Sequence, residues 1–112
     1  DRDGAILLGW TGDNGDPDNF LAVLLGCDGR ENSNRAQWCY QPFEDLIQAA
    51  KVLPTQAERQ PLYEEAQLVF KEQAPWATIA HSVVYMTMRP EVENYIVHPL
   101  GGHIFNAVGL SN

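Results

Sequence analysis

The stretch Gly9–Phe20, GWTGDNGDPDNF, joins an apolar segment to a helix and decides how the chain is organised. Residues 5–10 (AILLGW) form a short continuous apolar run, which is typical of a strand covered on both faces. Residues 11–18 (TGDNGDPD) collect glycine, aspartate and proline, a composition that predicts a loop. Asp16 followed by Pro17 then predicts a helix start, because a carboxylate suits the N-cap and proline suits the first helical position. The predicted order of elements is therefore a strand, a loop and a helix.

Three helices are predicted between this loop and residue 73. The first ends at Gly26, the second begins at Pro42 and breaks at residues 53–54, and the third begins with the capping-box pattern TQAE over residues 55–58. Each has an apolar face at helical spacing. The residues of these three faces are Phe20, Leu21, Leu24 and Leu25; Phe43, Leu46, Ile47 and Ala50; and Leu62, Ala66, Val69 and Phe70.

Extended structure is predicted after the third helix. Residues 77–88 (ATIAHSVVYMTM) are rich in β-branched side chains, and residues 95–97 and 104–110 are shorter candidates for strands. The predicted order is therefore strand, helix, helix, helix, strands, which is an α/β arrangement. These strands are too few to close a sheet by themselves.

Composition excludes several classes of function. The 112 residues carry 7 basic and 15 acidic side chains, a formal net charge of −8, which disfavours nucleic acid and anionic lipid as partners. No run of 18 apolar residues is present, so no membrane span is expected. The first residues also lack the basic-then-apolar pattern of a secretory leader. That absence carries little weight if the sequence is part of a longer protein.

The two cysteines, Cys27 and Cys39, lie in a polar stretch between the first two predicted helices. A disulfide between them is favoured over two unrelated thiols, because both flanks have the composition of a loop. Such a bond would require an oxidising compartment such as the periplasm. A metal site is disfavoured, since neither cysteine has a second ligand two to four positions away.

Several motifs together resemble one family. The run Gly9–Phe20 closely resembles the dipeptide-binding proteins of Gram-negative bacteria, which are members of the peptide- and nickel-binding family of solute receptors that serve ABC importers. The other matching motifs are Trp38-Cys39-Tyr40, Phe43-Glu44-Asp45-Leu46-Ile47, Gln73-Ala74-Pro75, Ile79-Ala80-His81-Ser82 and Pro99-Leu100-Gly101.

The resemblance implies that the chain is the C-terminal portion of a longer, two-lobed periplasmic binding protein of type II. Residues 1–82 would belong to the second lobe and residues 83–112 would return to pack on the first lobe. The remainder of the same receptor would then be a packing partner, because the apolar faces described above would otherwise lack part of their cover.

The resemblance also implies a ligand-binding loop. In the resembling proteins an aspartate at the position of Asp13 pairs with the α-ammonium group of the peptide. Backbone groups of Thr11 and Gly12 would add amide contacts, and Trp10 would line the cleft. From the residues alone, Asp13 could instead cap its own turn, and Trp10 could equally be a core residue. The group that binds the peptide carboxylate is expected outside these residues.

The function implied is capture of dipeptides in the periplasm and delivery to the permease subunits of an ABC importer. Alternatives are a receptor for an oligopeptide, haem or a nickel chelate, a truncated stand-alone interaction protein, or a small hydrolase. No enzymatic activity and no cofactor are expected: Ser82 and His81 are adjacent on a predicted strand and so point to opposite faces. A metal site made of the three histidines, or of Asp13 with its neighbouring aspartates, is also disfavoured because the spacing of neither set fits.

Overall fold

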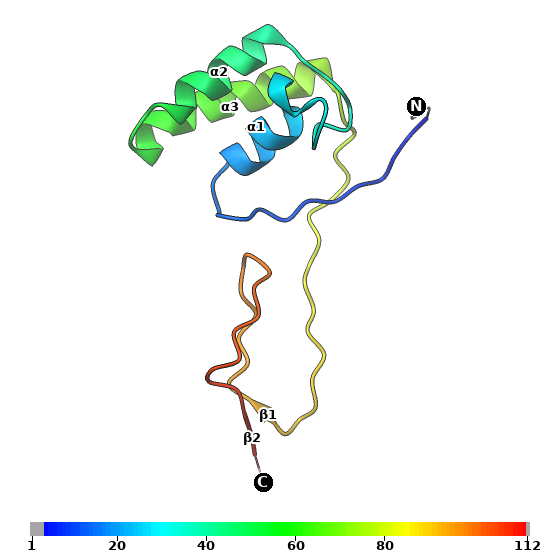
Figure 1. The fold of residues 1–112 in the computed structure, drawn as a ribbon, viewed down its shortest axis with the longest axis vertical. Helices are drawn as coiled ribbons and strands as arrows, with labels where there is room; N and C mark the ends of the chain where they lie inside the picture. Colours follow the sequence, from blue (N-terminus) through cyan, green and yellow to red (C-terminus); the bar gives the residue numbers. More distant parts are fainter. Residues whose placement is uncertain (1–3, 112) are drawn as a thin grey trace. The chain divides into compact units, whose positions relative to one another are not determined.

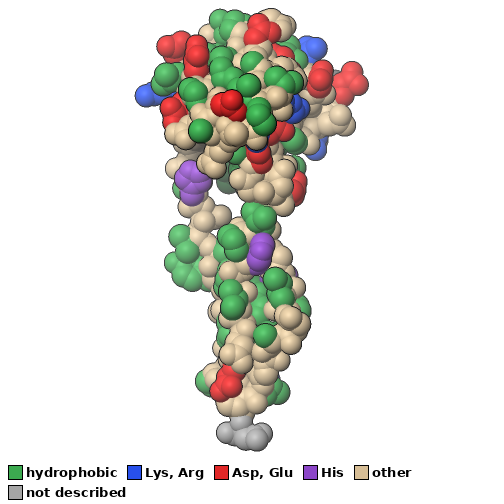
Figure 2. All heavy atoms as spheres, turned by 90° about the vertical axis from the view of Figure 1, so that its left-hand side faces the viewer, with side chains coloured by type: hydrophobic (Ala, Val, Ile, Leu, Met, Phe, Trp, Pro, Cys, Tyr) green, Lys and Arg blue, Asp and Glu red, His purple; other side chains and the backbone are tan. Residues whose placement is uncertain are grey.

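The computed structural model describes residues 4–111, which divide into two compact units, one up to Thr78 and one from Ile79. The first unit contains three α-helices, and the second contains a two-stranded sheet (Figure 1). Most of the charged side chains visible in the space-filling view belong to the helical unit (Figure 2). None of the helices in the described range is both long and apolar enough to cross a membrane.

Helix α1 (Asp18–Leu25) begins as its sequence predicts. Oδ1 of Asp16 accepts a hydrogen bond from the backbone N–H of Asp18 at 2.9 Å, and Pro17 already has helical dihedral angles. Asp16 therefore acts as the N-cap. The helix ends at Gly26, where a Cβ atom would collide with the carbonyl oxygen of Ala22, and a short 3-10 helix (Cys27–Gly29) follows.

Helices α2 (Gln41–Lys51) and α3 (Gln56–Gln73) lie side by side, joined by a four-residue turn (Figure 1). The predicted capping box at the start of α3 is confirmed. Oγ1 of Thr55 accepts a hydrogen bond from the backbone N–H of Glu58, and the Glu58 carboxylate accepts one from the N–H of Thr55. Two of the four backbone N–H groups that lack a partner within the helix at its N-terminus thereby have hydrogen-bond acceptors.

The core of the first unit lies where the three helices meet. Phe43 and Ile47 of α2 are fully buried there, and the indole of Trp38 packs edge-on against Phe43 with ring centroids 4.9 Å apart. Most of the predicted apolar faces point into this core or border it. The buried core residues are Leu24, Leu25, Phe43, Ile47, Ala50, Tyr63 and Ala66. Phe20 is an exception, because its ring is 43% exposed and packs on a loop instead.

The second unit is built on a short antiparallel pair of strands. β1 (Val92–Glu93) pairs with β2 (Gly109–Leu110), with Val92 opposite Leu110. In the segment between the strands, a 2.7 Å hydrogen bond joins the phenol oxygen of Tyr95 and Nδ1 of His103, and the ring of Phe105 lies against both rings.

Most of the predicted strands do not form within the described residues. Residues 5–10, 77–88 and 95–97 have no strand partner there, and of residues 104–110 only Gly109–Leu110 is paired. A strand is defined by a neighbouring strand, and within the described residues no strand pairs with these three segments. Apolar side chains in these segments are consequently exposed, as Leu7 (81%) and Tyr85 (83%) show. Three helices and a two-stranded sheet thus replace the fuller α/β arrangement expected from sequence.

Candidate functional site

The predicted ligand-binding loop, residues 10–13, lies directly before α1 in the first unit. The side chains of Trp10, Thr11 and Asp13 are exposed, with Trp10 at 41%, whereas Gly12 is buried. The loop therefore presents a carboxylate, a hydroxyl and part of an indole ring on its accessible side. This set of groups can bind a cation and an apolar surface together.

Asn19, in the first turn of α1, holds this loop through three hydrogen bonds. Its Oδ1 accepts from the indole Nε1 of Trp10 at 2.8 Å and from the backbone N–H of Asp13 at 3.1 Å. Its Nδ2 donates to Oδ2 of Asp13 at 3.1 Å. One amide side chain thus fixes the indole ring, the backbone and the carboxylate of the loop at once.

Gly12 packs against the ring of Phe20. A Cβ atom at Gly12 would lie 2.8 Å from Cε2 of Phe20, closer than carbon atoms approach in real structures. Glycine at this position therefore allows the loop to lie on α1, and the position of Phe20 outside the core is explained by this contact.

The start of α1 is tied to α3 by an ion pair. Both oxygens of Asp16 accept hydrogen bonds from the guanidinium of Arg59, each at 2.7 Å, and Nη2 of Arg59 also donates to the hydroxyl of Tyr63. The Arg59 hydrogen bonds, with that from the backbone of Asp18, hold the pKa of the Asp16 carboxyl below its usual value. The same pairing raises the pKa of Arg59, so the guanidinium stays charged.

Sequence analysis missed the two residues that organise the site, Asn19 and Arg59. Asn19 falls within the quoted motif, but its position in a helix gave no sign of a contact six residues back. Arg59 is 43 residues from Asp16 in the sequence, and no local pattern connects them. The position of Tyr63 beside Arg59 also explains its burial, since the phenol oxygen has a partner there.

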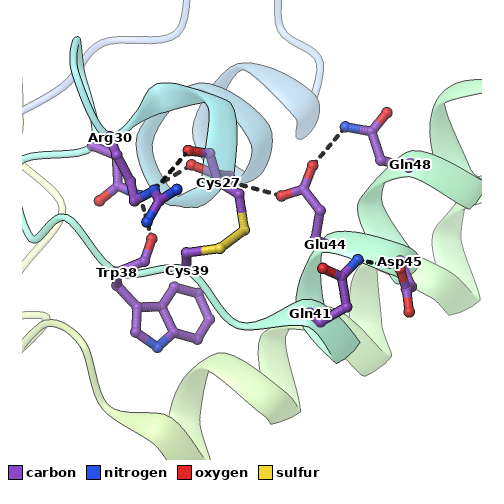
Figure 3. The surroundings of a disulfide bond; sticks show 10 residues. Cys27, Arg30, Trp38, Cys39, Gln41, Glu44, Asp45 and Gln48 are labelled. Atoms are coloured by element: carbon purple, nitrogen blue, oxygen red, sulfur yellow. Dashed lines mark hydrogen bonds between the residues drawn. A yellow bond between two sulfur atoms is a disulfide. The ribbon is translucent and has the colours of Figure 1, made fainter.

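The predicted disulfide is confirmed. Cys27 and Cys39 are bonded, with an S–S distance of 2.07 Å, and close the polar loop between α1 and α2 (Figure 3). Glu44 reaches from α2 to this loop, where its Oε2 accepts a hydrogen bond from the N–H of Cys27 at 2.8 Å (Figure 3). Asn34 is fully buried, and its Nδ2 donates to the carbonyl oxygens of Gly26 and Trp38.

No cluster of metal-ligating side chains is found in the part of the chain that the structure describes. No three His, Cys, Asp or Glu residues between positions 4 and 111 are grouped closely enough to hold an ion.

Comparison with known proteins finds relatives over nearly the whole chain. The dipeptide-binding protein of Escherichia coli (strain K12) is 51% identical over 106 residues, which cover 94% of this chain and 20% of that protein. The chain is homologous to one fifth of a bacterial dipeptide-binding protein. Di/tripeptide-binding protein 3 of Pseudomonas aeruginosa (strain UCBPP-PA14) is 45% identical over 93% of this chain and 20% of its own length. No family model matches the sequence.

One matching relative is named for haem, and one solved structure also matches. Heme-binding protein A of Haemophilus influenzae is 42% identical over 95% of this chain and 19% of its own length. The solved structure of HbpA2 from Haemophilus parasuis matches 92% of this chain and 20% of that chain, with a TM-score of 0.75 and 32% identity.

These comparisons confirm the resemblance predicted from the motifs. The chain is homologous to about one fifth of the length of proteins that are named for binding dipeptides or di/tripeptides. Its fold matches part of the solved structure of HbpA2. The division into lobes at residue 82 and the roles of Trp10, Thr11, Gly12 and Asp13 stay predictions.

Proposed function

We propose that this chain is part of a periplasmic receptor that captures dipeptides and delivers them to the permease subunits of an ABC importer. The observation that carries the proposal is the 51% identity to a dipeptide-binding protein over 94% of the chain. In this proposal residues 1–82 belong to the second lobe of the receptor, and residues 83–112 return to the first.

The loop before α1 supplies the chemistry of recognition. The Asp13 carboxylate pairs with the α-ammonium group of the peptide, and a hydrogen bond between two charged groups is about twice as strong as one between neutral groups. The exposure of Asp13 and the fixed position of its Oδ2 support this role. Backbone groups of Thr11 and Gly12 contact the peptide main chain, and the exposed part of the Trp10 indole lines the cleft.

Selectivity for a free amino terminus follows from closure of the lobes. When the cleft closes and excludes water, a carboxylate left without a cation is destabilised by several kcal/mol. An N-acetylated peptide has no ammonium group, so the Asp13 carboxylate would be left without a cation in the closed cleft. Side chains of the peptide contribute less, because terminal charges and main-chain hydrogen bonds carry most of the affinity.

The disulfide supports the periplasm as the site of action. The Cys27–Cys39 bond requires an oxidising compartment, and in bacteria the periplasm is one.

Haem is the second candidate ligand, since Heme-binding protein A of Haemophilus influenzae is 42% identical over the same residues. The identity to the dipeptide-binding protein is higher. A cationic group on the ligand is also the better complement to an exposed carboxylate, because haem carries two propionate groups of the same sign as Asp13.

The test is calorimetric titration of the full-length receptor that contains these residues, with a simple dipeptide, its N-acetylated form and haemin. Tight binding of the free dipeptide, lost on acetylation and weakened at least tenfold by Asp13→Asn, is the expected result. Asp28→Asn is the control, since Asp28 is an exposed aspartate on the neighbouring 3-10 helix. Preferential binding of haemin would mean that haem, not a dipeptide, is the ligand. Equal affinity for both peptides would mean that Asp13 is not part of the site.

A further inference from the structure

We propose that Asn19 is a positioning residue for ligand selectivity: it orients the Asp13 carboxylate and the Trp10 indole toward the ligand and does not touch the ligand itself. The inference rests on the proposed function, because it assigns a role to Asn19 through Asp13. Asn19 lies outside the predicted ligand-binding loop, residues 10–13, and belongs to a different element, helix α1.

The hydrogen-bonding capacity of Asn19 accounts for the arrangement. The side-chain oxygen of asparagine has two lone pairs, and both are used, one by the indole of Trp10 and one by the backbone N–H of Asp13. The amide nitrogen then faces Oδ2 of Asp13. These partners fix which end of the amide is oxygen and which is nitrogen. In the reversed orientation the amide NH2 would face the N–H groups of Trp10 and Asp13, and the amide oxygen would face the Asp13 carboxylate.

The consequence for Asp13 is a fixed carboxylate with one oxygen occupied. Oδ2 is held by Asn19, whereas Oδ1 makes no hydrogen bond with the described residues. A carboxylate so oriented pays less conformational entropy when it pairs with an ammonium group than a freely rotating one. The indole, fixed at the same anchor, loses no further freedom when an apolar ligand group packs on it.

Asn19 is itself anchored rigidly. It lies in the first turn of α1, and its N–H donates to the carbonyl oxygen of Asp16 at 3.1 Å. Asp16 in turn accepts hydrogen bonds from Arg59 of α3, so the start of the helix that carries the anchor is tied to a second helix. Positioning by a regular element is more exact than positioning by a loop alone.

The experiment compares Asn19→Ala with Asn14→Ala in the full-length receptor. Asn14 belongs to the same loop region, and among the described residues its Oδ1 accepts from the N–H of Asp16 alone. The control therefore removes a loop hydrogen bond that involves neither Trp10 nor Asp13. Calorimetry gives the affinities for a free and an N-acetylated dipeptide. We expect Asn19→Ala to weaken binding of the free dipeptide about tenfold and to lower the ratio of the two affinities, and Asn14→Ala to change that ratio less than twofold.

A double-mutant cycle separates this inference from the proposed function. If Asn19 acts through Asp13, the effect of Asn19→Ala falls to less than about threefold in an Asp13→Asn background. If Asp13→Asn alone leaves binding unchanged, the role of Asp13 in the proposed function is wrong, whereas the absence of any dipeptide binding by the wild type would contradict the proposed function itself. If Asp13→Asn weakens binding but Asn19→Ala does not, or weakens both ligands equally, the positioning role is wrong. Should Asn19→Ala fail to fold, Asn19→Ser takes its place with the same expectations.

Discussion

Arg59 of α3 binds both carboxylate oxygens of Asp16, each at 2.7 Å, across 43 residues of sequence. Asp16 also caps α1, and the residue that follows this cap by three positions is Asn19. The ion pair therefore joins the helix that carries the candidate ligand loop to the longest helix of the chain.

Asp16→Asn tests the contribution of this ion pair to stability. Because Arg59 lowers the pKa of Asp16 in the folded state, the ionised carboxyl stabilises the fold above its usual pKa of about 4, and this stabilisation is lost as the pH falls through the lowered value. Asparagine still caps a helix, so the variant keeps the cap while it removes the charge and one of the two oxygens that accept from Arg59. We expect a loss of about 1 kcal/mol in unfolding free energy at pH 7, which shrinks below pH 4.

Urea unfolding followed by circular dichroism at 222 nm, which reports on the three helices, measures the effect of Asp16→Asn. Asp45→Asn is the control, because the carboxylate of Asp45 has the neutral amide of Gln41 as its hydrogen-bond partner. A difference between the wild type and Asp16→Asn that stays constant from pH 7 to pH 3 would contradict the assignment.

The Cys27–Cys39 disulfide is expected to stabilise the helical unit through the unfolded state. It closes a loop with a sequence separation of 12, and the chain-entropy model gives about 3 kcal/mol for a loop of this size. Replacing both cysteines with alanine should lower the urea midpoint accordingly, and dithiothreitol should lower that of the wild type by a similar amount. Dithiothreitol should have no effect on the double variant; an unchanged midpoint in the double variant would contradict the prediction.

Ile47 tests whether the three helices share one core. Its side chain is fully buried, so Ile47→Ala should lower the unfolding free energy by about 2–5 kcal/mol and Ile47→Val by about 1 kcal/mol. Leu68→Ala is the matched control on α3, because Leu68 is 62% exposed and its loss should cost less than about 0.5 kcal/mol. Equal effects of Ile47→Ala and Leu68→Ala would mean that the helices do not pack as described.

Gly12→Ala tests the contact between the loop and α1. The added methyl group would lie 2.8 Å from the ring of Phe20, which must move, and we expect a loss of about 1 kcal/mol in unfolding free energy. A Phe20→Ala background should abolish that loss, since the obstructing ring is gone. Gly9→Ala is the control, because no atom lies within 4 Å of a Cβ added there. A loss that persists without Phe20 would place its cause elsewhere.

The isolated 112 residues are expected to bind a dipeptide weakly or not at all. They span about 20% of the length of their relatives, so a two-lobed cleft would draw most of its walls from other residues. Calorimetry of the isolated chain beside the full-length receptor measures the difference. A tight complex with the isolated chain would show that the loop alone is sufficient.

Local sequence signals predicted the helices well. The N-cap at Asp16, the capping box at Thr55 and the end of α1 at Gly26 each depend on contacts within a few residues, and all three are present. The disulfide was also predicted, because the composition around both cysteines excluded a core position.

Features that depend on distant residues were predicted poorly. The apolar runs at residues 5–10 and 77–88 indicated strands, but pairing requires a neighbouring strand, and no local pattern reports whether one is present. Asn19 and Arg59 were missed for the same reason. Their hydrogen-bond partners depend on how the chain folds back on itself, which the spacing of residues in the sequence does not report.

The short connection between α2 and α3 has a consequence for the speed of folding. Two helices that are neighbours in sequence, joined by four residues, make contacts at low sequence separation, and chains of this kind fold on the order of microseconds to milliseconds. The helical hairpin can therefore form early and serve as a template on which α1 condenses. Contacts between residues far apart in the sequence, such as Asp16 with Arg59, and the slower Cys27–Cys39 bond would then form on a hairpin that is already in place.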